Sequence, residues 1–241
     1  MFEISEKHIF EYMRCPLYYD LVNNKHIEVE KRFSVATHLG RVGNSFLINL
    51  MNGKVLTQTE LKKKWDAICE KEKDHITPSR CMEGVSQLMK LYLWAENQEL
   101  RIADVKTPYA VSIKSIFMPN TAIKVHGEME AISIGKNGSV ELLVLDFNNR
   151  SLDQSVLDMK IKYTLDSIAF KKLYGKDVGI HVHHVKDNKD YFAYRIKDDE
   201  ERLIATINSI AYSISKKLYY PRENILCSSC ELKNFCKGWR G

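Results

Sequence analysis

Three cysteines near the C-terminus have the spacing of metal ligands. Cys227 and Cys230 form a C-x2-C pair, and Cys236 follows after five intervening residues. Thiolates at such intervals can converge on one metal centre, although three sulfurs are one short of a four-thiolate site. On spacing alone, this group is compatible with zinc, with an iron–sulfur cluster or with three unrelated cysteines. A fourth cysteine, Cys15, lies near the other end of the chain.

The two remaining cysteines, Cys69 and Cys81, have no partner at ligand spacing. The N-terminus has early acidic residues and no uninterrupted apolar segment, so it does not resemble a secretory signal. No segment approaches the roughly 18 apolar residues that cross a bilayer. We therefore expect a soluble protein, cytoplasmic or otherwise intracellular, in which thiols stay reduced. In that setting we interpret Cys69 and Cys81 as small buried hydrophobic side chains.

The hydrophobic pattern predicts an α/β protein. Helical spacing predicts a first helix that breaks at Pro16, directly after Cys15, and a helical lobe over residues 40–104 with a break at Pro78. A period near two predicts three consecutive antiparallel strands between residues 105 and 147. The remaining predicted elements are one long helix, a pair of strands and an amphipathic helix, over residues 152–175, 177–196 and 198–220.

Both ends of the chain resemble a known nuclease family. SEKHIFEYMRCPLYY is similar to the opening of RecB-like nuclease domains, and NILCSSCELKNFC is similar to their closing cysteine tail. The resemblance is to the iron–sulfur branch of the PD-(D/E)XK superfamily, which includes the AddB helicase-nucleases and the CRISPR-adaptation nucleases. It extends over nearly the whole chain. It implies that a [4Fe-4S] cluster, with zinc as the alternative, is bound by four cysteines: Cys15, Cys227, Cys230 and Cys236.

The resemblance also implies a fold. We expect a restriction-endonuclease-like central mixed sheet flanked by helices, with an N-terminal helical lobe and a C-terminal four-cysteine clasp. The chain would form a single domain over residues 1–241, made of the lobe (40–104), a nuclease-like core (105–197) and a cysteine-rich tail (221–241). A metal centre that joins the two ends closes a very long loop, so its loss should loosen both termini.

In this family two carboxylates hold a divalent cation, Mg²⁺ or Mn²⁺, and a lysine two residues after the second carboxylate assists the reaction. HGEMEAI matches the first strand and gives Glu130 where aspartate is usual, whereas LLVLDFNN matches the second strand and gives Asp146. Asn148 stands where the lysine is expected. A lysine on the following helix, Lys160 or Lys162, could in principle restore the charge.

Two further positions depart from the family pattern. A metal-binding histidine is expected four residues after a helical glycine, and Asn44 stands at that distance from Gly40. The Gln-x-x-x-Tyr motif that contacts the substrate backbone keeps only Tyr163, with Met159 at the glutamine position. Together with Glu130 and Asn148 these departures indicate a site that has decayed or been repurposed.

Lysines with neighbouring tyrosines could bind nucleic acid, because lysine contacts phosphates and aromatic rings stack on exposed bases. The net charge of +5, from 36 Lys and Arg against 31 Asp and Glu, permits such a partner. Each lysine group alone is also typical of a solvated helix face. The positions that we select on two helices are Lys171, Lys172, Lys216 and Lys217. We interpret the histidines of IHVHHV, including His181 and His183, as paired or exposed strand residues.

These observations leave three hypotheses, in decreasing order of preference. The first is an iron–sulfur protein of nuclease fold with a degraded active site that binds single-stranded or ended duplex DNA. Such a protein would act in replication, recombination or mobile-element processing, with a possible protein partner in a larger complex. The second is an active metal-dependent DNA exo- or endonuclease. The third is a protein-interaction subunit without DNA contact.

Overall fold

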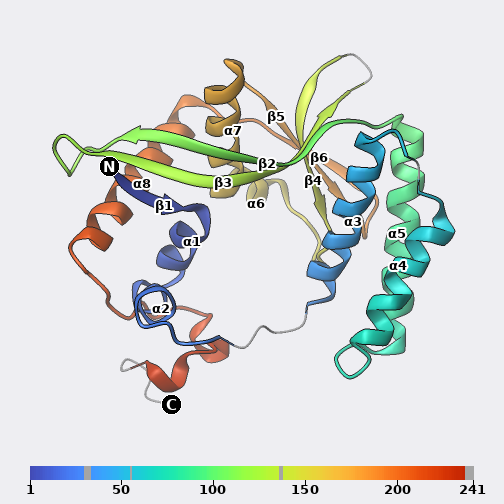
Figure 1. Ribbon diagram of the computed structural model, residues 1–241, viewed down its shortest axis with the longest axis horizontal. Helices are drawn as coiled ribbons and strands as arrows, with labels where there is room; N and C mark the ends of the chain where they lie inside the picture. The colour runs from blue at the N-terminus through green and yellow to red at the C-terminus, as the bar shows by residue number, and fades with distance from the viewer. Residues whose placement is uncertain (30–33, 55, 136–137, 237–241) are drawn as a thin grey trace. The chain divides into compact units, whose positions relative to one another are not determined.

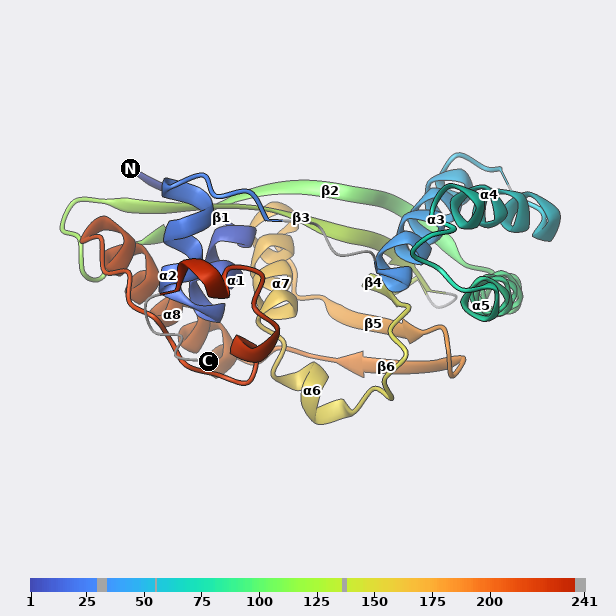
Figure 2. The ribbon, with the colours of Figure 1, turned by 90° about the horizontal axis from the view of Figure 1, so that it is seen from below.

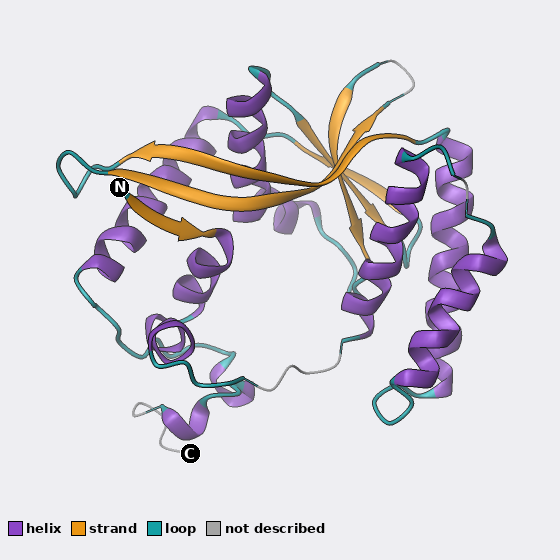
Figure 3. Ribbon diagram, in the orientation of Figure 1, coloured by secondary structure: helices purple, strands orange, loops and turns teal. Residues whose placement is uncertain are grey.

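The computed structural model describes residues 1–29, 34–54, 56–135 and 138–236. Residues 237–241 of the predicted tail lie outside this part of the chain. The strands form one mixed sheet flanked by helices, as Figures 1 and 3 show. The predicted α/β class and central mixed sheet are therefore confirmed. No helix in the described ranges is long and apolar enough to cross a membrane.

Strand β3 is central to the pairing pattern. It pairs in parallel with β1, antiparallel with β4, and also with β2. Beyond β4 the sheet continues with β5, which is parallel to β4, and β6, which is antiparallel to β5. The strands are β1 (Phe2–Ser5), β2 (Arg101–Lys114), β3 (Ala122–Ile134), β4 (Val140–Asp146), β5 (Gly179–His184) and β6 (Lys189–Ala193).

The consecutive strands β2, β3 and β4 confirm the prediction for residues 105–147. The first strand, β1, was not predicted. Its four residues do alternate apolar and polar side chains, but two such periods directly before a helix are too short a pattern to separate from the helix that follows.

The chain forms two compact units. The first unit contains residues 1–32, 109–127 and 197–241. Its helices are α1 (Glu6–Arg14), α2 (Pro16–Tyr19) and α8 (Lys197–Ser215). Ser5 caps α1, and α2 begins at Pro16 directly after Cys15, as the Cys-Pro step predicts. The two ends of the chain are joined by hydrogen bonds, including one from the Tyr12 hydroxyl to the Leu218 carbonyl at 2.7 Å.

The second unit contains residues 33–108 and 128–196. Figure 1 shows its helices α3 (Val35–Met51), α4 (Gln58–Lys71) and α5 (Pro78–Gln98) side by side, as the predicted helical lobe requires. Their apolar faces form a core with the end of β4, in which Leu145 and Phe147 pack with Phe46 and Trp65. Trp65 is fully buried, and its indole nitrogen donates a hydrogen bond of 2.8 Å to the Cys81 carbonyl.

The interpretation of Cys69 and Cys81 as unpaired buried side chains is wrong. Cys69 lies on α4 and Cys81 on α5, and the two form a disulfide. Both side chains are partly buried at the edge of the core rather than inside it. The pairing depends on how two antiparallel helices face each other, which the spacing of twelve residues does not reveal.

The single long helix expected over residues 152–175 is in fact two helices, α6 (Gln154–Asp158) and α7 (Ile161–Tyr174). Asp153 caps the first and Gly175, with φ of +71°, ends the second, so the predicted outer boundaries are confirmed. Arg195 stabilises the break, because one of its terminal nitrogens donates hydrogen bonds to the carbonyls of Leu157 (2.7 Å) and Lys160 (3.3 Å). The residue that fixes this break is about 35 positions further along the chain.

Candidate active site

The register of β3 and β4 brings Glu130 and Asp146 to the same face of the sheet. Ala131 lies opposite Leu143, so these two side chains share one face and their neighbours point to the other. Glu130 precedes Ala131, so it points to the second face. On β4 the residues that point to this face are Leu142, Val144 and Asp146. Asp146 is buried, with 6% of its surface exposed, and Glu130 is half-buried. Two carboxylates thus lie on neighbouring strands, as the family pattern predicts.

Asn148 stands at the position where the family has lysine, and it is hydrogen-bonded to Asp146. Its side-chain amide and its backbone N–H (3.1 Å) both donate to Asp146 Oδ1. The carbonyl oxygen of Asn148 accepts a hydrogen bond of 3.0 Å from His184 Nε2. The segment after β4 is therefore held in place, and one carboxylate oxygen of Asp146 already has two donors. A neutral amide supplies hydrogen bonds here but no positive charge.

The first turn of α7 carries the three other residues selected from the sequence. Lys160 Nζ lies 3.3 Å from the Tyr163 hydroxyl. Lys162 Nζ donates to the Glu128 carbonyl and to Asp166 Oδ1, both at 2.7 Å. Tyr163 is buried, with 3% exposure, so its ring is not presented as a surface for stacking bases.

The ionisation of this cluster depends on burial and on its lysines. Burial raises the pKa of Glu130, and the nearby charge of Asp146 raises it further, whereas Lys106 and Lys162 oppose the rise. Burial also raises the pKa of the Tyr163 hydroxyl, and the charges of Asp146 and Glu130 act in the same direction. These electrostatic couplings place Glu130, Asp146 and Tyr163 in one cluster.

Asn44 lies on α3, close to the end of β4. The preceding residue, Gly43, lies against the side chains of Phe147 and Leu145, and a Cβ at this position would be 2.9 Å from the Phe147 ring. The Asn44 side-chain oxygen is buried without a hydrogen-bond partner among the described residues. An amide oxygen and two carboxylates are hard oxygen donors of the kind that Mg²⁺ and Mn²⁺ prefer.

Several residues of the site were not selected from the sequence. Glu128 and Asp166 contact Lys162, and Arg195 contacts the turn before α7. Lys106 contacts Glu128. The alternation of β3 could have identified Glu128, because it shares a face with Glu130. No signal in the sequence identifies Lys106, which comes from β2.

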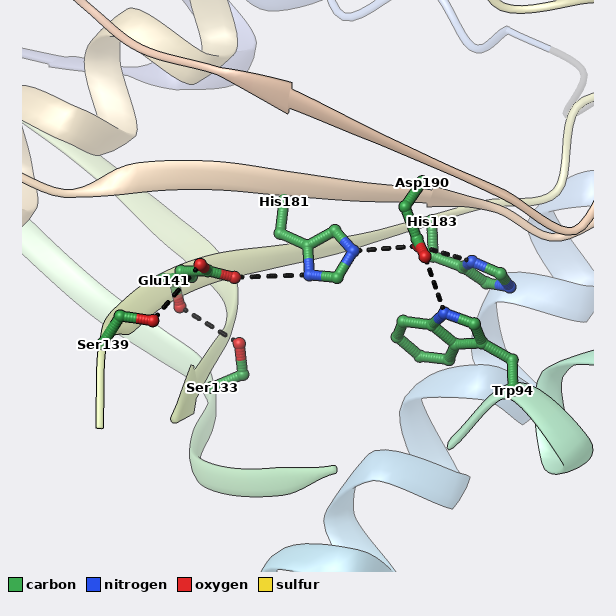
Figure 4. Close-up of polar contacts among 7 residues, drawn as sticks. All are labelled: Trp94, Ser133, Ser139, Glu141, His181, His183 and Asp190. Carbon is green, nitrogen blue, oxygen red and sulfur yellow. Dashed lines mark hydrogen bonds and ion pairs between the residues drawn. The ribbon is translucent and has the colours of Figure 1, made fainter. Parts of the chain in front are cut away.

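The opposite face of the sheet carries a second polar cluster, shown in Figure 4. Asp190 Oδ1 accepts hydrogen bonds of 2.9 Å from His181 Nε2 and His183 Nδ1, and Asp190 Oδ2 accepts one of 3.1 Å from Trp94 Nε1. The other nitrogen of His181 lies 3.3 Å from Glu141. The interpretation of these histidines as paired strand residues agrees with this arrangement. Figure 2 shows β5 and β6, which carry them, lying side by side.

The ionisation of this second cluster stabilises its geometry. Burial favours a neutral Asp190, but the hydrogen bonds from His181, His183 and Trp94 outweigh it and lower the pKa of this carboxyl. Burial lowers the pKa of His183, whose ring stacks on Trp94 with 3.9 Å between centroids. The cluster connects α5 to β5 and β6. Its histidines share a face with Leu143 and Leu145, not with Asp146, so it is separate from the carboxylate pair.

The four cysteines selected as ligands lie in the first unit. All four are half-buried, and none of them forms a disulfide. Arg222 connects Cys15 and Cys227: its N–H donates to Cys15 Sγ at 3.4 Å, and its carbonyl lies 3.8 Å from Cys227 Sγ. An ion pair of 2.8 Å joins Arg14, next to Cys15, to Glu231, next to Cys230. Residues from the two ends of the chain are therefore neighbours.

In the described ranges, no group of three or more His, Cys, Asp or Glu residues is arranged so that it could hold a metal ion. The chemistry of the donors fits a thiolate-bound metal, because four free thiols come from segments that contact each other.

The lysines selected for DNA binding lie in both units. Lys171 and Lys172 are in the last turn of α7, where Lys171 forms an ion pair of 2.8 Å with Asp177. Lys216 and Lys217 directly follow α8, and the Lys216 ammonium lies 5.7 Å from the centre of the Tyr212 ring. Each pair is at a helix C-terminus, where positive charge is favourable for the helix itself.

No model of a protein family matches the chain, and no curated protein is similar to it in sequence. Among solved structures, it is similar to a protein from Eubacterium rectale described as a "putative exonuclease", with a TM-score of 0.56 and 10% identity over 95% of this chain and 86% of the other. SSO0001 aligns with a TM-score of 0.37 and 14% identity over 92% of this chain and 94% of the other, which is too low to support an argument. The first likeness shows that this chain shares its fold with that protein.

We predict that Glu130→Gln raises the thermal stability of the protein at pH 7. The folded pKa of Glu130 is raised, so this residue stabilises the fold below its unfolded pKa near 4.5 and loses that contribution as the pH rises through the folded pKa. At pH 7 the charged form is therefore costly, and glutamine removes the charge. Thermal unfolding followed by circular dichroism should show a higher Tm for the variant at pH 7 and a smaller difference at pH 4.

The matched control is Glu70→Gln, whose side chain is 82% exposed and 4.0 Å from Lys73. It should change the free energy of unfolding by less than about 0.5 kcal/mol. A lower Tm for Glu130→Gln than for wild type at pH 7 would show that the lysines, and not burial, dominate the ionisation of Glu130.

Proposed function

We propose that this protein binds DNA through a nuclease-like fold whose cutting site is degraded. The observation that carries the proposal is that Asn148, which stands where the family has a lysine, donates hydrogen bonds to Asp146. A lysine there would help to stabilise the charge that develops during phosphodiester cleavage, and removing one such group typically lowers the rate by about 10²–10³. Asparagine keeps Asp146 in position but supplies no charge.

The carboxylates support this proposal in a second way. A divalent cation in such a site is usually held by one or two carboxylates together with oxygens of the substrate phosphate. Glu130, Asp146 and the oxygen of Asn44 are the residues that would hold it, and the metal would polarise the phosphate. Burial raises the pKa of Glu130, so a cation bound there would compete with a proton for this carboxylate.

The proposal includes a [4Fe-4S] cluster held by Cys15, Cys227, Cys230 and Cys236, as in the iron–sulfur branch of the RecB-like nucleases. Its support is the resemblance of both chain ends, the free state of the four thiols and the contacts of Arg222 with Cys15 and Cys227. Zinc is the alternative for the same ligands. The role of the centre would be structural, because it would crosslink the first and last segments of the chain.

The second candidate function is an active metal-dependent nuclease. It is favoured by one observation, the location of Lys162 between the Glu128 carbonyl and Asp166 on the side of the sheet that carries Glu130. A lysine on α7 could supply the missing charge. If the protein neither binds nor cleaves DNA, the results favour a protein-interaction subunit without DNA contact.

We predict that the wild-type protein binds DNA but cleaves it weakly or not at all. Binding by many dispersed lysines survives the loss of one catalytic group, whereas cleavage does not. Fluorescence anisotropy with single-stranded and duplex oligonucleotides should show binding that weakens as salt increases. Incubation of the same oligonucleotides with Mg²⁺ or Mn²⁺ should show little product on a denaturing gel.

Efficient cleavage that is abolished in Asp146→Asn would promote the nuclease alternative. Absence of both binding and cleavage would leave the protein-interaction subunit as the better account. The Asp146→Asn protein should bind DNA at least as well as wild type, because the substitution removes a negative charge from the site.

We predict that protein purified without oxygen contains iron and sulfide and absorbs near 400 nm. Thiolate ligands hold such clusters, so changing one of them should remove most of the cluster. Cys227→Ser should lose the absorbance and lower the Tm. Cys69→Ser is the matched control, since Cys69 is bonded to Cys81 and should leave the absorbance unchanged.

If elemental and sulfide analysis finds zinc and no sulfide, the four cysteines bind zinc and not an iron–sulfur cluster, and the four-cysteine centre is kept. A protein with neither iron nor zinc after anaerobic purification would contradict the centre altogether.

A further inference from the structure

Lys106, which belongs to none of the nuclease motifs, lies beside the carboxylate pair. It is on β2, and its ammonium nitrogen lies 3.0 Å from Glu128 Oε1. Its side chain is 43% exposed, and among the described residues Glu128 is its ion-pair partner. An ammonium group carries three N–H donors, so a single carboxylate does not use its full capacity. The exposed ammonium group can therefore bind an anionic ligand.

Glu128 also contacts a second lysine, through its backbone carbonyl. Its carbonyl accepts a hydrogen bond of 2.7 Å from Lys162 Nζ, while its carboxylate holds Lys106. Lys162 is also fixed by Asp166, of which only 5% of the side chain is exposed. Glu128 is two residues before Glu130 on β3, so one residue positions lysines from β2 and α7 next to the carboxylate pair.

The backbone at Lys106 is unusual for a strand. Its φ is +61°, in the left-handed region that lysine seldom adopts. Just before it, Asp104 Oδ1 accepts a hydrogen bond of 2.8 Å from the Val105 N–H, although β2 continues through this irregular position. Strained backbone of this kind tends to persist at functional sites, where the position of one side chain matters.

We propose that Lys106 and Lys162, both held by Glu128, bind one phosphate group of a DNA backbone beside Glu130 and Asp146. The inference rests on the proposed function and adds the residues that contact the ligand. Each ammonium group binds a phosphate oxygen as a point charge. The pair comes from β2 and α7, so its positive charge lies at a different place from the lysine that the family has at the position of Asn148 on β4, and it does not replace that lysine. The same two lysines oppose the rise in the pKa of Glu130 that burial causes.

The variant Lys106→Asn tests this proposal. Asparagine tolerates a left-handed backbone better than most residues, so the strand should fold while the charge is lost. Lys162 is a poorer target, because its removal takes a partner from the buried Asp166. Anisotropy with a labelled DNA oligonucleotide should show affinity about five- to tenfold weaker than that of wild type, and a salt dependence whose slope is smaller by about one. Lys106→Arg should recover most of the affinity.

The matched control is Lys73→Asn, which removes an exposed lysine paired with Glu70 and placed at the end of α4. It should leave both the affinity and the salt slope within error of wild type. Wild-type binding together with unchanged affinity and slope in Lys106→Asn would overturn the phosphate pair while leaving the proposed function intact. A wild-type protein that does not bind DNA would overturn both. Equal losses in Lys106→Asn and Lys73→Asn would show a diffuse charge effect and would also overturn the specific pair.

Discussion

The register between β3 and β4 is the constraint on which the candidate site depends. Because side chains alternate along a strand, a slip of one residue would move Glu130 to the face that packs against the helical lobe. The register is fixed by the apolar residues on both faces: Ala131 and Leu143 lie in the core with α3 and α5, and Ile132 pairs with Leu142. The hydrophobic core of the second unit therefore decides where the carboxylates lie.

The two faces of β3, β4 and β5 have different polar chemistry. On one face, two carboxylates have lysines from β2 and α7 as neighbours, and these lysines oppose the rise in the pKa of Glu130 that burial causes. On the other face, Asp190 is surrounded by donors from His181, His183 and Trp94, and no donor in this set is exposed enough to bind a large ligand readily. The second cluster stabilises the contact of α5 with the sheet, whereas the first can still interact with a ligand.

Much of the fold was predictable because it follows from local patterns. The helices of the lobe, the break at Pro16 and the three strands before Asp146 each have a clear period or a proline. The pairing of Cys69 with Cys81 and the break between α6 and α7 were not predictable, because they depend on contacts between distant residues. For the same reason the sequence suggested Glu130, Asp146 and Lys162 but not Lys106, whose place beside Glu128 depends on the pairing of two strands and an irregular backbone.

If the missing charge at Asn148 limits DNA cleavage, a lysine placed there should restore it. The most direct test is the variant Asn148→Lys, assayed for cleavage of a labelled oligonucleotide in Mn²⁺ beside wild type and the double variant Asn148→Lys with Asp146→Asn. A lysine at this position would replace the amide that bonds Asp146 with a positive group near the phosphate. We expect metal-dependent cleavage to rise at least about tenfold over wild type and to be lost again in the double variant. Cleavage by wild type that equals or exceeds that of Asn148→Lys would show that the charge at position 148 does not limit the reaction.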